Sequence, residues 1–422
     1  MSQPLLPRRR AEEFRARNRG GMPEGILAEA AVIVKGVRSG GEEALRGYTA
    51  RFEDCAPSAP LYLKEEILKS HLHDLPGDER NRLERIADRI RTFARSQRGA
   101  LAPVDTPVPG GRAGHCIDPV EAAGCYAPGG RHPLPSSVLM TVVTARAAGV
   151  RSVWVASPHP APITLAAAAV AGADGVLVAG GAHAIAALAF GVGPIPPSDI
   201  VVGPGNLYVT AAKQLLAGQV QIDMLAGPSE LLVIADAGAD PAWVASDLLA
   251  QAEHDPHAVP ILISLDSEFP SLVEREIERR LEDLPAASTA RAALANGGVI
   301  VCETEDAACL ASDDIAPEHL QLSVSNPEAW PDRLHHYGAL FIGERAAEVF
   351  GDYGVGPNHV LPTGGTARAR GGLSVMDFLR VRTWIRADSA PDLDLIEDVA
   401  WFARKEGLEA HARAAEIRRE KT

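Results

Sequence analysis

Cysteine is scarce in this chain, and its spacing excludes two common kinds of site. The 422 residues contain 5 cysteines, an odd number, and no Cys-x-x-Cys pair. We therefore expect neither a disulfide framework nor a thiolate zinc site, a pattern typical of the reducing cytoplasm. No long apolar run follows the basic segment Pro7-Arg8-Arg9-Arg10. The sequence thus predicts a cytoplasmic protein with no signal peptide and no membrane span.

Positive charge is also in short supply. The formal net charge of -14 argues against nucleic acid or an anionic membrane as the main partner. The remaining composition, 46% hydrophobic and 23% charged with 39 glycines and 32 prolines, is that of a globular protein with many short elements. The length predicts two or three folding units.

The apolar pattern predicts helical ends around a central α/β region. Residues 1–25 form a charged arm, followed by helices from about Glu29, interrupted at Gly40-Gly41, and over 79–95. After Pro119, strands alternate with helices, which predicts parallel sheets covered on both faces. The expected strands are 152–156, 175–178, 200–202, 231–235, 261–265, 299–302, 320–324 and 339–342, and the helices are 163–171, 183–190, 207–217, 240–253 and 272–281.

The C-terminal part departs from this alternation. Residues 362–374 are rich in glycine and threonine and have the composition of a linker. Two helices are expected after it, over 393–405 and 408–418. A detached helical tail of this kind often packs on a partner subunit.

Three glycine-rich turns, at 128–130, 180–181 and 203–206, follow expected strands and open helices. Such turns let a ligand approach the backbone and direct helix N–H groups at an anion, so they can hold a phosphate or a dinucleotide. None matches the G-x-G-x-x-G fingerprint, and similar turns occur in any α/β protein. The motif alone leaves both readings open.

Polar side chains near the end of the helix 240–253 could hold a metal. Gln251 and His254 are three residues apart and share a helix face. His254 could equally be a cationic residue favoured by the helix C-terminus. Farther on, Glu318-His319 precedes a strand and suits acid-base chemistry, although such a pair is also common as surface polarity.

The last polar segments are equally ambiguous. Asp352 and His359 lie in a loop whose glycines and proline fix its path, so they are either site residues or a turn former and a hydrogen-bonded loop residue. Glu406 precedes Gly407, a possible C-cap, and His411 follows in the tail. Periodicity does not separate these alternatives.

Taken together, these segments resemble the histidinol dehydrogenase family over nearly the whole chain, from about Ala31 to Arg418. Several such motifs in the family's order are far more specific than any one of them. They are Tyr126-Ala127-Pro128-Gly129-Gly130, residues 134–140, Gly203-Pro204-Gly205-Asn206, residues 222–230, Gln251 to Pro256, residues 315–319 and residues 356–366.

The resemblance implies a homodimeric enzyme that takes L-histidinol through the aldehyde to L-histidine with two NAD. One zinc per subunit would be held by Gln251, His254, Asp352 and, from the other subunit, His411. A mixed O/N set suits zinc and leaves room for the imidazole and amine of the substrate. The zinc would mainly orient the alcohol.

The resemblance also implies roles for the remaining residues. His319 would remove the alcohol proton, and Glu318 would help to activate water for the second oxidation. Both, with the metal ligands, would contact substrate. The other substrate-contacting positions are Ser229, His359 and the partner's Glu406, and the positions that touch NAD are Tyr126, His183 and Asn206.

The implied fold is α/β, with two incomplete Rossmann-like domains. One would combine 26–120 with 232–372 and carry the zinc and the catalytic residues; the other, 121–231, would bind NAD. The arm 1–25 and the helical tail 373–422 would be extensions that swap in the dimer.

Two departures from the family pattern bear on specificity. His183 stands where the family usually has glutamine, and Arg131-His132 is bulkier and more basic than the expected small residues. Relatives of the same fold oxidise other alcohols, notably sulfopropanediol. Because the chain keeps the histidinol-type forms of 253–256 and 356–359, histidinol is the predicted substrate, with the sulfonated diol as the alternative.

A zinc hydrolase would need no dinucleotide turns, and a non-catalytic relative would have lost a ligand position.

Overall fold

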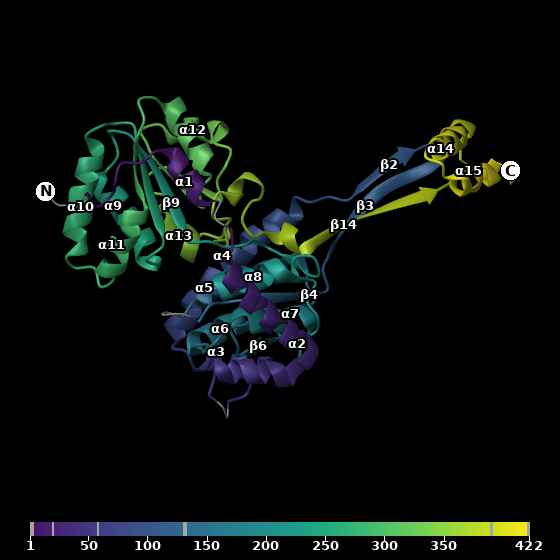
Figure 1. The fold of residues 1–422 in the computed structure, drawn as a ribbon, viewed down its shortest axis with the longest axis horizontal. Helices are drawn as coiled ribbons and strands as arrows, with labels where there is room; N and C mark the ends of the chain where they lie inside the picture. Colours follow the sequence, from purple (N-terminus) through teal and green to yellow (C-terminus); the bar gives the residue numbers. More distant parts are fainter. Residues whose placement is uncertain (1–3, 19–20, 57–58, 130–132, 389–390, 420–422) are drawn as a thin grey trace.

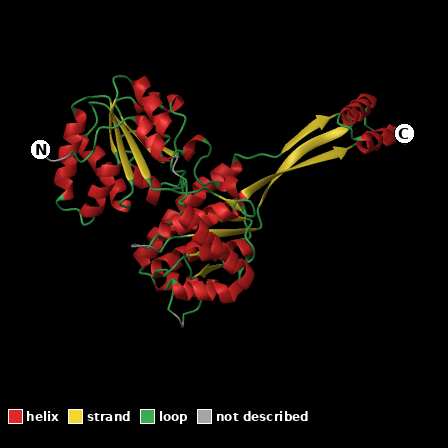
Figure 2. Ribbon diagram, in the orientation of Figure 1, coloured by secondary structure: helices red, strands yellow, loops and turns green. Residues whose placement is uncertain are grey.

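The chain forms two parallel sheets, each covered by helices on both faces, and a slender antiparallel ribbon that ends in a helical tail (Figures 1 and 2). The structure, a computed structural model, describes residues 4–18, 21–56, 59–129, 133–388 and 391–419. Arg131 and His132 therefore lie outside the described residues. The two parallel-sheet domains confirm the predicted fold class.

The first domain is built on a six-stranded sheet of β1 (Tyr62–Lys64), β4 (Ala122–Tyr126), β5 (Ser152–Ala156), β6 (Gly175–Leu177), β7 (Ile200–Val202) and β8 (Gln221–Ile222). The strand order is β1-β6-β5-β4-β7-β8. Neighbouring strands are parallel except β1, which pairs antiparallel with β6. Every residue of β4, β6 and β7 is buried, as expected for strands covered on both faces.

Helices cover both faces of this sheet. On one face lie α3 (Glu65–Asp74), α4 (Gly77–Gly99), α5 (Pro135–Ala148) and α6 (Pro162–Ala171), and on the other lie α2 (Glu24–Arg51), α7 (Gly181–Phe190) and α8 (Leu207–Leu216). Helix α5, which the sequence analysis does not anticipate, is buried through most of its length. It carries almost no amphipathic period, the signal by which a surface helix is found.

The predicted interruption at Gly40-Gly41 is confirmed. Gly41 has φ 54° and ψ -134° inside α2, so the helix is kinked there. The two halves fold toward one another, because a Cβ on Gly36 would lie 2.5 Å from the Tyr48 hydroxyl oxygen. As a result, residues from both halves of α2 line one cavity of this domain.

The predicted domain boundary is wrong for residues 26–120. Helices α2, α3 and α4 contribute to the cores of the six-stranded sheet, and β1 is hydrogen-bonded to its edge strand β6. The sequence analysis assigns these residues to the other sheet. An amphipathic helix shows which of its faces is buried, but its pattern does not say which sheet that face covers.

The second domain has a fully parallel five-stranded sheet in the order β11-β10-β9-β12-β13. Its strands are β9 (Glu230–Ala235), β10 (Val259–Ser264), β11 (Gly298–Val301), β12 (His319–Ser323) and β13 (Ala339–Ile342). One face packs on α9 (Pro241–His254), α10 (Phe269–Leu281) and α11 (Ala287–Asn296), and the other on α1 (Ala11–Asn18) and α12 (Glu305–Ile315). The remaining elements are α13 (Glu348–Tyr353) and the short 3₁₀ turns η1 (Pro327–Ala329) and η2 (Pro331–Arg333).

The N-terminal arm packs on its own chain. Arg8 forms a parallel bridge with Val299 at the sheet edge, with the Val299 amide donating to the Pro7 carbonyl at 2.9 Å and the Arg9 amide donating to the Val299 carbonyl at 2.9 Å. Leu6 and Phe14 are each 2% exposed. Its apolar anchors are thus buried against the second domain of its own chain, and the swap of this arm between subunits stays a prediction.

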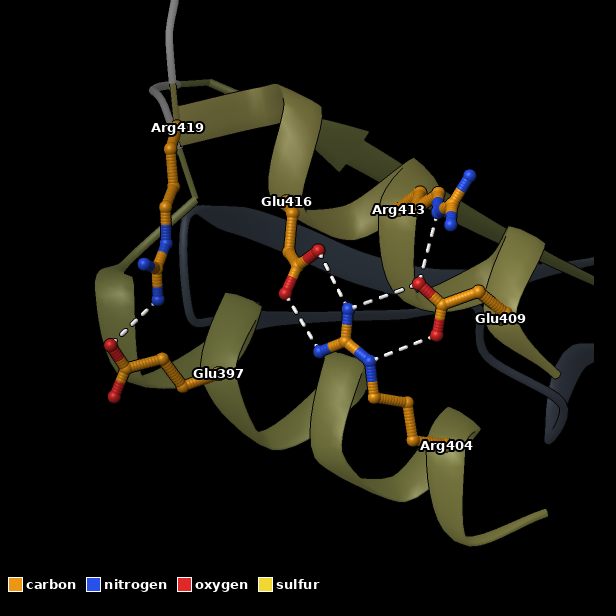
Figure 3. Close-up of polar contacts among 6 residues, drawn as sticks. All are labelled: Glu397, Arg404, Glu409, Arg413, Glu416 and Arg419. Atoms are coloured by element: carbon orange, nitrogen blue, oxygen red, sulfur yellow. Dashed lines mark hydrogen bonds and ion pairs between the residues drawn. The ribbon is translucent and has the colours of Figure 1, made fainter. Parts of the chain in front are cut away.

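A three-stranded ribbon leads away from both domains to the tail (Figure 1). It consists of β2 (Val104–Val108), β3 (Gly111–Pro119) and β14 (Leu379–Ala387), reached through η3 (Thr366–Arg368) and η4 (Val375–Phe378). The tail contains α14 (Leu393–Lys405), α15 (Glu409–Glu416) and η5 (Ile417–Arg419), which confirms the two predicted helices. Arg404 of α14 binds the carboxylates of Glu409 and Glu416 and so ties the two helices together (Figure 3).

Within the described part of the chain, no helix is both long and apolar enough to cross a bilayer.

Candidate active site

The pair Glu318 and His319 lies at the amino end of β12, buried against the first residue of β9. His319 Nδ1 is 3.1 Å from the Glu230 carbonyl oxygen, and the Glu230 amide donates to Glu318 Oε2 at 2.9 Å. A carbonyl only accepts hydrogen bonds, so Nδ1 carries the proton and Nε2 is the basic nitrogen of the neutral ring. Parallel pairing of β9 with β12 therefore fixes the tautomer that a general base requires.

Carboxylates from α13 face the basic nitrogen of His319. Nε2 lies 3.7 Å from Asp352 Oδ1 and 3.9 Å from Glu348 Oε1. It forms no hydrogen bond with any described residue. Nε2 is thus held in a polar cavity, where its lone pair is available to a substrate hydroxyl whenever the ring is neutral.

Gln251 and His254 bring the C-terminal end of α9 to the same place. Gln251 is 1% exposed, yet its Oε1 has no hydrogen-bond partner within the described ranges. Burial raises the pKa of Asp352, but the nearby imidazoles of His319, His359 and His254 outweigh it and hold that pKa below its usual value. His254 is therefore near enough to act on Asp352, and an orphaned buried carbonyl oxygen is a position that a cation would satisfy.

His359 lies beside Asp352, and Ser229 is the residue before Glu230. His359 Nδ1 is 3.0 Å from the Asp352 carbonyl oxygen, so by the same reasoning its Nε2 is the free acceptor. Burial lowers the pKa of His359, which favours the neutral ring. Ser229 precedes Glu230, and its carbonyl accepts the Val259 amide at 3.0 Å, which joins the amino ends of the neighbouring strands β9 and β10.

The site holds more acidic groups than cations. Burial raises the pKa of Glu318 to about 7 and that of Glu348 to about 8, with the charge of His319 opposing both shifts. Burial lowers the pKa of His319, but Glu318, Asp352 and Glu348 together raise it to about 10. Burial and then Glu318 raise the pKa of Glu230 to about 8. Such crowding of carboxyl groups is relieved by a bound cation.

A buried amide links this cluster to the helix behind it. Gln321 donates to Asp247 Oδ2 at 2.6 Å, and its own Oε1 accepts the Glu348 amide at 3.3 Å. The link joins α9 to the first turn of α13. It therefore sets the distance between the elements that present Gln251 and Asp352.

The three predicted NAD positions lie together in the first domain. Tyr126, His183 and Asn206 line one cavity of about 530 Å³, beyond the carboxyl ends of β4, β6 and β7. Ligands bind at this edge in open α/β sheets. The Tyr126 hydroxyl accepts the Gly181 amide at 3.1 Å, and Asn206 Oδ1 caps α8 by accepting two amides.

His183 does not project freely into this cavity. Its Nε2 is 2.5 Å from Asp54 Oδ2, which also accepts the Gly180 amide at 2.9 Å. Its ring stacks on Phe52 with the ring centroids 5.4 Å apart. His183 is thus part of the cavity wall, 2% exposed and held on two sides.

The comparisons with known proteins identify the family. The sequence model for histidinol dehydrogenase matches residues 18–419. The chain belongs to the histidinol dehydrogenase family. A histidinol dehydrogenase from Thermus thermophilus is 44% identical, with 97% of this chain and 99% of that protein covered. One from Nitrosospira multiformis is 42% identical, with 93% and 91% covered.

A solved structure supports the same assignment. The crystal structure of histidinol dehydrogenase from Elizabethkingia anophelis superposes with a TM-score of 0.92 at 30% identity and covers 99% of each chain. The histidinol dehydrogenase family oxidises histidinol to histidine in histidine biosynthesis, and its members are NAD-dependent and zinc-binding. A cavity for a dinucleotide and an acidic cluster for a metal are therefore both expected of a histidinol dehydrogenase.

Two residues predicted for the histidinol dehydrogenase site lie elsewhere in this chain. Glu406 and His411 lie in the tail, which Figure 1 shows far from α9 and α13. His411 borders a groove between α14 and α15 instead. Of the four expected ligands, His254 and Asp352 lie near enough within the single chain to influence one another, and Gln251 lies three residues before His254 on α9.

Sequence reasoning missed Glu348. It is 1% exposed, and its ligand oxygen, one from Asp352 and one His319 nitrogen lie within 4.8 Å of one another, so these three residues also form a candidate metal group. A signal existed, because Glu348 and Asp352 are four residues apart and share a face of α13.

Proposed function

We propose that this chain oxidises L-histidinol through the aldehyde to L-histidine, with two NAD reduced in turn at a zinc-containing site. The observation that carries the proposal is the His319 ring, whose Nδ1 is held by the Glu230 carbonyl and whose Nε2 is open toward Asp352. A base of fixed tautomer beside metal-ligand side chains suits dehydrogenation of an alcohol.

The roles of the catalytic pair follow from their positions. NAD supplies the hydride acceptor in each oxidation. His319 Nε2 takes the hydroxyl proton as the alcohol carbon loses hydride and becomes the aldehyde. Glu318, whose pKa of about 7 allows it to be either acid or base near neutrality, takes a proton from the water that adds to the aldehyde carbon. Loss of a second hydride from the hydrate leaves the carboxylic acid.

For the zinc we propose Gln251, His254, Asp352 and His411 of the partner subunit. The unpartnered Gln251 Oε1 and the excess of carboxylates support a cation here, since Gln251 Oε1 and both Glu348 carboxylate oxygens have no hydrogen-bond partner among the described residues. His319 shares the candidate group with Glu348 and Asp352, but a nitrogen bound to metal could not take the substrate proton. When bound, zinc supplies a positive charge that orients the imidazole and amine of the substrate.

Because His411 lies in the tail, far from α9 and α13 of its own chain, it can bind the zinc only at the site of a partner subunit. The proposed ligand set therefore requires a homodimer. Apolar side chains are exposed on the ribbon and tail, with Ile385 85%, Trp401 60% and Phe402 59% exposed, and others on α13 beside the site, with Phe350 54% and Tyr353 52% exposed. Exposed apolar surface on this scale marks an interaction site. We propose that each tail packs on the partner's α13 and carries His411 and Glu406 there, with Ser229 and His359 contacting substrate from the chain itself.

The charge of the site favours histidinol over a sulfonated diol. Glu230, Glu318, Glu348 and Asp352 surround His319 and suit a ligand with a protonated amine. An anionic sulfonate would meet the same carboxylates as like charges. A small polar metabolite as substrate, with no nucleic acid or membrane as partner, also fits a location in the cytoplasm.

The test is NADH formation by the purified, zinc-loaded protein with L-histidinol or dihydroxypropanesulfonate. We expect two NADH per histidinol consumed and weak activity on the sulfonate. One NADH per histidinol would show that the second oxidation does not take place. Turnover of the sulfonate in preference to histidinol would transfer the chain to the alternative substrate while leaving the fold and metal site in place.

A further inference from the structure

The cavity that holds the three NAD positions has an aromatic and an apolar wall. Tyr48 comes from the second half of α2 and Phe52 directly follows that helix, with the His183 ring stacked on Phe52 at an interplanar angle of 18°. Val32 and Ile33 come from the first half. A flat heteroaromatic ring such as adenine is accommodated by surfaces of this kind.

Two carboxylates line the same cavity, and they differ in what they already bind. Asp54 is 8% exposed, and its Oδ2 is occupied by the Gly180 amide and by His183 Nε2. Glu29, on the first half of α2, is exposed, and its Oε2 accepts the Tyr208 hydroxyl at 2.8 Å. The Glu29 carboxylate forms no other hydrogen bond with a described residue, so it keeps acceptor capacity toward the cavity.

We propose that Glu29, oriented by Tyr208, binds the two hydroxyl groups of the adenosine ribose and thereby selects NAD over NADP. Two neighbouring hydroxyls are two donors, and a carboxylate offers two acceptor oxygens. A 2′-phosphate would remove one donor and place negative charge against Glu29. This inference rests on the proposed placement of NAD in this cavity.

The neighbouring groups support this assignment. Tyr208 follows Asn206 by two residues, and because Asn206 Oδ1 caps α8, only the Asn206 amide hydrogens are left for a ligand. The cation that lines the cavity with these acids is Arg51, whose guanidinium lies over the Phe52 ring, 5.3 Å from its centroid. Arg51 is at the opposite end of α2 from Glu29, where it faces the aromatic wall.

The experiment compares Glu29→Gln with wild type and with Glu24→Gln, in zinc-loaded protein at saturating L-histidinol. Glu24 lies in the first turn of the same helix, is exposed, and does not line the cavity. We expect the ratio of kcat/KM for NADP to that for NAD to rise at least about tenfold in Glu29→Gln, since a hydrogen bond to a charged group is lost with NAD and a repulsion is removed with NADP. The ratio should stay at the wild-type value in Glu24→Gln. An unchanged ratio in Glu29→Gln would overturn the assignment.

A second variant separates this inference from the placement of NAD. Val32 lines the cavity and is 68% exposed, so Val32→Trp fills the cavity without entering the core. We expect it to raise the KM for NAD. If it does so while Glu29→Gln leaves the ratio unchanged, only the role of Glu29 fails. If the KM for NAD is unaffected, NAD binds elsewhere, and both proposals are overturned.

Discussion

The imidazole that we propose as the catalytic base is oriented by the main chain. His319 donates to the Glu230 carbonyl, and the Glu230 amide is bound by Glu318. A peptide carbonyl does not ionise, so it accepts from Nδ1 at every pH and leaves Nε2 as the basic nitrogen whenever the ring is neutral. Burial places further titratable groups around this pair, and their charge states have consequences for stability as well as for catalysis.

Asp247 is the buried carboxyl whose protonation we expect to affect stability most simply. Burial raises its pKa from 3.8 to about 6, against the hydrogen bond from Gln321. The protonated form is favoured in the folded state, so its stabilisation is complete below about pH 4 and is lost as pH rises through about 6. Asp247→Asn keeps an acceptor for Gln321 and cannot ionise. It should therefore be more stable than wild type at pH 8, by up to about 3 kcal/mol.

Urea unfolding of both proteins at pH 4.5 and pH 8, at one protein concentration, measures this difference. The exposed Asp332→Asn should show none. A stability gain for Asp247→Asn that is equal at both pH values would show that the ionised carboxylate is not the cause.

The two sheets present their functional residues at opposite ends of their strands. The NAD positions follow the carboxyl ends of β4, β6 and β7, whereas His319 and Glu230 begin β12 and β9. Helix α9 runs back to that amino edge and ends at His254, which explains why a helix C-terminus supplies two metal-ligand candidates. The general rule for open α/β sheets therefore locates the proposed NAD cavity and misses the proposed catalytic pair.

Helix α2 builds its side of the cofactor cavity through one glycine. Gly41 adopts a backbone conformation that side chains rarely reach, so Gly41→Ala should destabilise the fold by about 1–2 kcal/mol. It should also raise the KM for NAD, because Val32 and Phe52 lie on opposite sides of the kink. Thermal unfolding and steady-state kinetics measure the two effects.

Gly47→Ala is the matched control in the same helix. Its Cβ would meet no atom within 4 Å, and Gly47 is not at the kink. Alanine favours helix over glycine, so this variant should be neutral or stabilised by up to about 1 kcal/mol. Equal effects of the two substitutions would mean that the kink is not specific to Gly41.

The sequence predicts the elements better than it predicts their partners. The strand-helix alternation, the break at Gly41 and both tail helices are confirmed. Strand β14 is not predicted, although Leu379, Val381 and Ile385 alternate with arginines as in a strand with one apolar face. Val381 and Ile385 are exposed in the single chain, so this face belongs to no core that the rest of the sequence could indicate. Local patterns cannot show that His411 lies far from Gln251 in the same chain. That ligand followed only from resemblance to the family.

At the scale of the whole molecule, the proposed exchange of tails makes two inactive chains complement one another. His319→Asn and His411→Ala should each be inactive as homodimers. In a heterodimer, one site would combine the His319 of one chain with the His411 of the other. Refolding equal amounts together should restore about a quarter of wild-type activity, since half of the dimers are mixed and each holds one intact site.

The control pairs His319→Asn with Asp352→Ala. Both residues belong to the body of one chain, 3.7 Å apart, so every mixed dimer would still lack one of them at each site. No activity should return. Recovery in this control, or none in the first mixture, would be incompatible with a tail that acts on its partner.

The N-terminal arm is translated long before the strand of the second domain with which it pairs. Arg8 pairs with Val299, and Leu6 is buried against helices that follow residue 230. All six strands of the first sheet, by contrast, lie between residues 62 and 222. At about 5–20 residues per second, roughly 15–60 s pass between translation of the arm and translation of its partner strand. The six-stranded sheet can therefore form on the ribosome with the arm unpaired, before Val360, Leu373 and Phe378 complete the core on one of its faces. The edge of the second sheet is covered only after most of the chain has emerged.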